Sequence, residues 1–174
     1  MKLTPVMEKF ILHWGEMGTR WGVNRTVAQI HALLYLAPQA LNAEEISETL
    51  GVARSNVSTS LKELLSWELI KVNHVLGDRR DHFESKKDLW EIFNCIVTGR
   101  KKREIDPTLT LLRQCELEAE HDAETADEIK ERIRSMNEFL ETLTTWYEQM
   151  NAIPKSTLLK LMKLGNRITR LLGK

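Results

Sequence analysis

A cluster of short polar side chains, bordered by two cations, lies in the middle of the chain and has the chemistry to contact a nucleic acid. Its members would share the outer face of one helix: Arg54, Ser55, Asn56, Ser58, Thr59 and Lys62. Short side chains let a helix approach base edges in a major groove about 12 Å wide, where asparagine reads adenine and arginine reads guanine. The N-terminus of such a helix also favours a phosphate. These residues predict a DNA-reading helix, and an ordinary helical hairpin of a bundle is the alternative.

A pair of arginines, Arg79 and Arg80, forms a second candidate at the expected tip of a β-hairpin. Residues 69–75 are rich in β-branched types, a Gly-Asp pair supplies turn chemistry, and residues 81–84 read as the return strand. Guanidinium groups at such a tip would meet the phosphate backbone or enter the adjacent minor groove. An aspartate on either side of the pair offers a bidentate partner. We expect one arginine to reach DNA and an aspartate to hold it.

The elements that would position these groups form a helix-turn-helix. Gly51 can adopt the positive φ that a sharp turn between helices requires, and Val52 would fill that turn. Apolar residues at helical spacing line the inner faces of the two helices: Ile46, Leu50, Val57, Leu61 and Leu64. With the hairpin that follows, this pattern predicts a winged helix-turn-helix.

Helices are expected on both sides of the winged helix. Apolar steps of three and four predict one N-terminal helix that ends near Gly22, a second that stops at Pro38, and further helices over 89–97 and 109–117. The most regular apolar pattern predicts one long helix, and we call its apolar residues the seam: Ala126, Ile129, Ile133, Met136, Leu140, Leu143, Tyr147 and Met150. A last helix over 156–172 would carry Leu158, Leu161, Leu164, Ile168 and Leu171. Either this last helix or a second copy of the chain must cover the seam, and the spacing alone does not decide between them.

The composition is that of a soluble, ordered globular protein. The 174 residues include 25 basic and 25 acidic residues and 42% hydrophobic residues, which excludes a disordered chain. Although the net charge is zero, residues 116–148 are strongly acidic, and every charged residue in 155–174 is basic. A basic run at 100–103 would form a solvated helix end or pair with the acidic helix. The local electrostatic potential of a basic segment can therefore attract a polyanionic partner even though the net charge is zero.

Other classes of protein and site are disfavoured. Two cysteines, Cys95 and Cys115, make no disulfide framework and are expected to be buried and inert, so the default location is the cytoplasm. Neither a signal peptide nor a membrane-spanning segment is recognisable. A metal site from His74, Asp78 and His82 lacks a fourth ligand at credible spacing. No catalytic motif appears, so we expect neither enzymatic activity nor a cofactor.

The chain resembles the MarR-type bacterial regulators, and more closely their GbsR-like branch. The resemblance rests on Trp14-Gly15 and Arg20-Trp21-Gly22, on SNVSTSLKELLSWELI, on the hairpin GDRRDHFES and on KDLWEIFNCIV with RKKREIDPTL. It implies a homodimeric, sequence-specific transcriptional regulator. One departure is Ala53, where many such helices begin with Ser or Thr, since alanine at this position loses about 0.5–2 kcal/mol of capping. Either the helix begins later, at Ser55, or a DNA phosphate supplies the missing partner.

The branch resemblance also suggests a choline-like or betaine-like effector. Four tryptophans outside the reading helix could cage a quaternary ammonium by cation–π attraction: Trp14, Trp21, Trp90 and Trp146. The alternative is that these rings belong to the core and to the dimer seam.

The sequence therefore predicts a mainly α protein, a winged helix-turn-helix with a small β-hairpin wing flanked by N- and C-terminal dimerisation helices. The expected parts are an N-terminal helix contributing to dimerisation at 1–24, the DNA-binding domain at 25–87 and a helical dimerisation region at 88–174. A homodimer would bind double-stranded DNA at a palindromic operator with half-sites roughly 34–36 Å apart and repress transcription. The alternative function is a helical interaction protein that binds a protein partner through its heptad seam and does not bind DNA.

Overall fold

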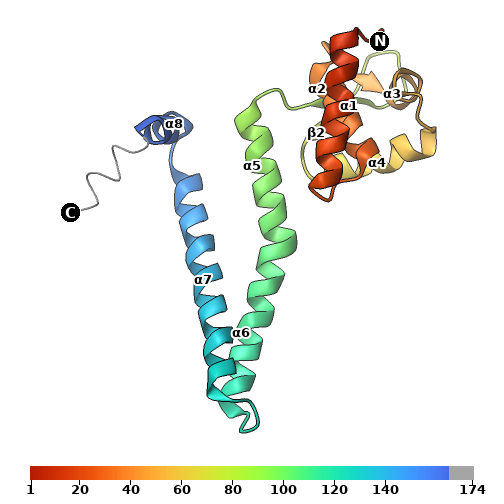
Figure 1. Cartoon of the computed structure of the whole chain (residues 1–174). Coiled ribbons are helices and arrows are strands. Elements are labelled where there is room, and N and C mark those ends of the chain that lie inside the picture. Colours follow the sequence, from red (N-terminus) through yellow and green to blue (C-terminus); the bar gives the residue numbers. More distant parts are fainter. Residues whose placement is uncertain (165–174) are drawn as a thin grey trace. The chain divides into compact units, whose positions relative to one another are not determined.

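The computed structural model describes residues 1–164 and divides the chain into two compact units, Met1–Gly99 and Arg100–Lys174. Each unit is described by itself. The first contains α1 (Pro5–Arg20), α2 (Arg25–Leu36), β1 (Leu41–Asn42), α3 (Ala43–Leu50), α4 (Arg54–Ser66), β2 (Ile70–Asn73), β3 (His82–Ser85) and all but the last residue of α5 (Leu89–Arg100) (Figure 1). The mainly helical winged fold predicted from the sequence is confirmed.

Helix α1 packs closely on α2. Thr4 caps its start by accepting a hydrogen bond from the Met7 N–H at 3.3 Å. A Cβ on Gly18 would lie only 2.5 Å from the Cβ of Ala28, so the absence of a side chain there permits the helices to approach. The N-terminal helix is thus part of the same compact unit as the winged helix, and its contribution to a dimer stays a prediction.

The core of the first unit is centred on α2, which is buried over most of its length. Ile30, Leu33 and Leu34 are almost completely inaccessible, as are Ile46 of α3 and Val57 and Leu64 of α4. The three residues of α3 and α4 are inner-face positions of the predicted helix-turn-helix. Gly51, between α3 and α4, has φ 63°, which is the left-handed conformation expected from the turn.

The end of α2 is held by a lysine that lies 50 residues further along the chain. Lys87 Nζ donates to the carbonyls of Leu34, Tyr35 and Ala37 at 2.7–2.8 Å. These carbonyls have no partner within the helix because two belong to its last turn and the third to Ala37, which caps it. A positive charge also complements the negative end of the helix dipole. Lys87 therefore ties the segment after the wing to the centre of the fold.

The sheet has three antiparallel strands in the order β1-β3-β2. Phe83 of β3 is paired with Leu41 on one side and with Val72 on the other. The predicted hairpin corresponds to β2 and β3. The two-residue strand β1 was not predicted, and it joins the wing directly to the segment that opens α3.

The second unit contains a π-helical turn, η1 (Lys101–Ile105), followed by α6 (Asp106–His121), α7 (Asp127–Ala152) and α8 (Lys155–Leu164). Helices α6 and α7 lie side by side (Figure 1). Asn137 of α7 is buried and donates to Glu116 of α6 at 3.0 Å, and Arg113 pairs with Glu141 at 2.8 Å. Part of the basic run also pairs with the acidic helix, since Lys101 Nζ lies 3.3 Å from Glu148.

The apolar seam of α7 is divided between two sides. Ile133, Leu140, Tyr147 and Met150 are half-buried, whereas Ile129, Met136 and Leu143 are exposed. Within the chain, α6 packs on α7, a partner that the seam alone did not reveal. Ile168 and Leu171 of the expected last helix lie outside the described residues. No helix in residues 1–164 has the length and apolar character to span a membrane.

Candidate nucleic-acid interface

Helix α4 begins without a side-chain cap. Ala53 occupies the N-cap position, the helix starts at Arg54, and no side chain accepts a hydrogen bond from the first turn. The later start at Ser55 is therefore wrong. The uncapped N–H groups of the first turn remain available to an external acceptor, and an anion such as a phosphate suits both the donors and the helix dipole.

The polar cluster lies on the exposed face of α4. All six predicted residues are exposed: Arg54, Ser55, Asn56, Ser58, Thr59 and Lys62. Val57, Leu61 and Leu64, from the same helix, are buried. Thr59 Oγ1 donates to the Ser55 carbonyl at 3.2 Å, which leaves the other side chains of the cluster uncommitted among residues 1–164. The helix thus presents short hydrogen-bonding groups to solvent, and their contact with DNA stays a prediction.

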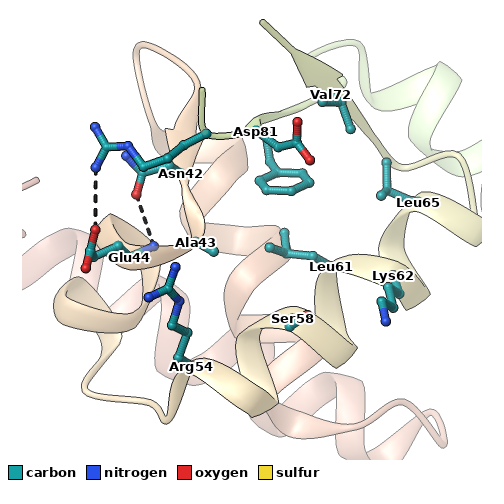
Figure 2. A pocket seen from close by; sticks show the side chains of 12 residues that line it. Asn42, Ala43, Glu44, Arg54, Ser58, Leu61, Lys62, Leu65, Val72 and Asp81 are labelled. Atoms are coloured by element: carbon teal, nitrogen blue, oxygen red, sulfur yellow. Dashed lines mark hydrogen bonds and ion pairs between the residues drawn. The ribbon is translucent and has the colours of Figure 1, made fainter. Parts of the chain in front are cut away.

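A cavity of about 470 Å³ lies between α4 and the sheet. Its lining combines four apolar side chains with three cations and two carboxylates: Leu61, Leu65, Val72 and Phe83, then Arg54, Lys62 and Arg80, and then Glu44 and Asp81. Figure 2 shows Leu61 and Leu65 on α4 and Val72 on β2 around this space, with Arg54 toward the start of α4. The hollow joins the exposed polar face of α4 to the base of the wing in one surface. Sequence reasoning missed it because its lining residues come from four separate segments.

The two arginines of the wing are in different situations. Arg80 forms a bidentate pair with Asp78, with Nε–Oδ1 at 3.0 Å and Nη2–Oδ2 at 2.6 Å. Arg80 Nη1 also lies 3.4 Å from Oε2 of Glu44, at the start of α3, and Figure 2 marks this pair with a dashed line at Glu44. The hydrogen bonds from Arg80 hold the pKa of Asp78 well below its usual range, and those to Asp78 raise the pKa of Arg80. The bidentate aspartate expected from the sequence is confirmed, and Glu44 is an additional partner.

Arg79 is exposed and forms neither a hydrogen bond nor an ion pair with any residue between 1 and 164. The second flanking aspartate, Asp81, lies 3.7 Å from His74 and does not contact either arginine. Of the pair, Arg79 is therefore the arginine that is free to meet an outside anion, and Arg80 is the arginine whose direction is set by the protein.

The strands of the wing are braced on one face by polar contacts. Glu84 accepts a hydrogen bond from Asn73 Nδ2 at 2.8 Å and pairs with Lys71 at 3.3 Å. The bond from Asn73 is the main reason that the pKa of Glu84 is lowered. These contacts hold β2 and β3 in register, which fixes where the tip of the hairpin lies relative to α4.

The four candidate effector tryptophans do not form one cluster in the first unit. Trp14 stacks on Phe10 with ring centres 5.5 Å apart, and Trp90 lies 5.4 Å from Phe93. Trp21 is 64% exposed after α1, and Trp146 is 56% exposed on α7 of the second unit. Their role toward an effector stays a prediction.

The cysteines and the metal alternative add no chemistry to this surface. Cys95 and Cys115 are half-buried free thiols, and burial raises the pKa of Cys95, which disfavours the reactive thiolate. No group of three or more metal-binding side chains is found in the described part of the chain.

Comparison with known proteins agrees with this geometry. Residues 21–81 match the family model described as MarR family. The HTH-type transcriptional repressor GbsR of Bacillus subtilis is 23% identical over 78% of this chain and 77% of that protein. The putative HTH-type transcriptional regulator YvaV of the same organism is 22% identical over 83% of this chain and 81% of its own.

A crystal structure described as that of a transcriptional regulator has the same fold. It superposes with a TM-score of 0.63 at 18% identity and covers 91% of this chain and 99% of the other. The relatives are named as regulators and not as enzymes, in agreement with the missing catalytic motifs. The segment that matches the family model contains the helix-turn-helix and the first strand and tip of the hairpin, and over most of its length the chain is similar to these two transcriptional regulators.

Proposed function

We propose that the protein binds double-stranded DNA sequence-specifically, as a homodimer at a palindromic operator, and represses transcription by occluding the promoter. The observation that carries this proposal is the continuous surface formed by the exposed polar face of α4, the hollow that Arg54 and Lys62 help to line, and the free Arg79 of the wing. Such a regulator acts in the cytoplasm. The similarity to the transcriptional repressor GbsR supports repression over activation.

The geometry favours a division of roles on DNA. Helix α4 enters the major groove, where Asn56 reads a base edge and its uncapped first turn meets a phosphate. The wing lies over the adjacent backbone and minor groove. Arg79 makes the outer contact there, while Arg80 is directed by Asp78 and Glu44. Phosphate contacts set affinity and position, and base contacts set the sequence.

A second copy of the chain is the partner that we infer for the exposed side of α7. Five exposed apolar residues follow a heptad pattern along it: Ile129, Met136, Phe139, Leu143 and Trp146. The other side of α7 is already packed on α6. A helix of 26 residues is about 39 Å long, which is enough for several layers of packing between copies. The same face would serve the alternative function, a protein-binding module that does not contact DNA.

An effector of the choline or betaine type completes the proposal. Trp21 keeps exposed ring surface on which a quaternary ammonium can bind by cation–π attraction. The ligand would regulate only by binding unequally to two arrangements of the dimer. Titration of the DNA complex with betaine and with choline should release DNA for the parent and not for Trp21→Ala. Release from both proteins, or from neither, would contradict this role.

DNA binding is tested with fragments selected from random duplexes by the full-length protein. The logarithm of the DNA affinity should fall steeply with the logarithm of the salt concentration. A protein-binding module would not show this salt dependence. Arg79→Ala and Arg80→Ala should weaken binding to all sequences, and Arg79→Ala should reduce the salt slope by about 1. Asn56→Ala should relax discrimination at one base position.

Lys9→Ala is a matched control, because Lys9 is an exposed cation on α1, away from the interface. Equal operator affinity of the parent, the three interface variants and this control would overturn the assigned roles. A lack of any palindrome in the selected fragments would contradict the symmetric homodimer.

The dimer surface is tested by placing a charge in its centre. Met136→Glu should convert the dimer to a monomer in sedimentation velocity and reduce operator affinity with it, since a buried unpaired carboxylate is strongly unfavourable. Thr145→Glu, on an exposed polar position of the same helix, should leave the dimer intact. A dimer that survives Met136→Glu would mean that another surface joins the copies.

A further inference from the structure

The outermost part of the wing is apolar. Leu76 is fully exposed and Val75 is 47% exposed, at the tip of the loop between β2 and β3. The turn holds them there: Gly77 has φ 85°, and the Asp78 N–H donates to the Val75 carbonyl at 3.0 Å. Exposed loop tips usually carry small or polar residues. A leucine presented in this way has no packing role in the first unit.

One cation beside these two side chains is available to a polyanion. Asp78 is neutralised by Arg80, and Asp81 lies beside His74. Arg79 follows the turn and keeps its guanidinium uncommitted among the described residues. The tip carries two arginines and two aspartates, and it places Arg79 beside the apolar surface.

The small size of the apolar tip limits what can cover it. A stable protein interface buries about 800 Å² on each partner, far more than two aliphatic side chains provide. Val75 and Leu76 can contribute only where other contacts already hold the partner in place. In the proposed DNA complex, α4 and Arg79 contact the sugar-phosphate backbone. The tip of the loop between β2 and β3 then faces the minor groove.

We propose that Leu76 is a minor-groove wedge, which enters between two adjacent base pairs with Val75 behind it while Arg79 contacts a flanking phosphate. Leucine is among the side chains that partly unstack a base step and bend the duplex when inserted in this way. The step should be of the pyrimidine–purine type, because those steps unstack most easily. Leu76 thereby favours DNA sequences in which this base step deforms easily. No hydrogen bond to a base is needed at that position. This role rests on the proposed DNA binding.

The experiment uses the full-length protein and duplexes selected from random sequence. 2-Aminopurine, whose fluorescence rises on unstacking, is placed in turn at each position of a selected duplex. The parent should raise the signal at one step in each half-site, and Leu76→Ser should abolish the rise. In a second measurement, a mismatch is placed at that step, so that its bases are already partly unstacked. The mismatch should tighten DNA binding by the parent about tenfold and leave the DNA affinity of Leu76→Ser unchanged.

A matched control is Val6→Ser, which removes an exposed apolar side chain from α1 and should behave as the parent in both measurements. Operator binding by the parent without a fluorescence rise at any position would overturn the wedge and leave the DNA-binding proposal standing. A rise that persists in Leu76→Ser would also overturn it. Failure of the parent to select any duplex would remove the DNA-binding proposal, and the wedge with it.

Discussion

Acid should destabilise the first unit through one buried imidazole. His31 lies in the middle of α2, is only 6% exposed, and its Nε2 finds no hydrogen-bond partner within the described chain. Burial lowers the pKa of His31 from 6.5 to about 4, and the charge of Lys87 adds to this effect. The neutral ring is tolerated in the core, and the protonated ring is not.

The direction and size of the effect follow from proton linkage. The unfolded chain binds a proton at His31 near pH 6.5 and the folded chain only near pH 4, so unfolding takes up a proton between these values. The stability present above pH 6.5 is lost progressively as the pH falls toward 4. The full difference corresponds to roughly 3 kcal/mol of unfolding free energy, of which about 2 kcal/mol is lost between pH 7 and pH 5. That is a large share of the ~5–15 kcal/mol typical of a domain.

Urea unfolding at pH 7, 6 and 5, followed by tryptophan fluorescence, measures this loss. His31→Leu should flatten the pH dependence and keep or raise the stability at pH 7, because it removes a buried nitrogen that lacks a partner. His13→Leu, at an exposed position of α1, should keep the parent's pH dependence. The lowered pKa values of Asp78, Glu84 and Asp122 act mainly below this range. An equal loss between pH 7 and 5 in the parent and His31→Leu would refute the reasoning.

Two other changes test how the first unit is held together. Gly18→Ala should destabilise it by about 1–3 kcal/mol in urea unfolding, because the new Cβ would lie 2.5 Å from that of Ala28. Adding Ala28→Gly should recover part of the loss, and a neutral Gly18→Ala would contradict the close contact. Lys87→Met should lower the unfolding free energy by about 1–2 kcal/mol, since three carbonyls lose a charged donor that is itself partly solvated. Lys86→Met, the control, should change it by less than about 0.5 kcal/mol.

The winged helix was predictable because its signals are local. The left-handed glycine at 51, the inner-face residues around Val57 and the turn at Gly77 each act within a few neighbours in the sequence. The pairing of Asp78 with Arg80 is likewise local, since only two residues separate them. Such features follow from turn chemistry and helical periodicity alone.

The features that escaped prediction depend on distant parts of the chain. Glu44 reaches Arg80 across 36 positions, and Lys87 reaches the end of α2 across about 50. Strand β1 has only two residues, too few for any alternation to show. The seam of α7 indicated an apolar face but not its partner, because a heptad pattern is equally compatible with every helix that carries one.

The shared sheet also limits how this protein can be re-engineered. Because Leu41 and Asn42 pair with the return strand of the wing, and Asn42 also caps α3, the hairpin and the helix-turn-helix share backbone hydrogen bonds. A hairpin transplanted from another regulator would have to bring a matching two-residue segment from before α3. Exchange of residues 70–85 alone should leave an unpaired strand edge, and exchange of 41–85 as one cassette should not.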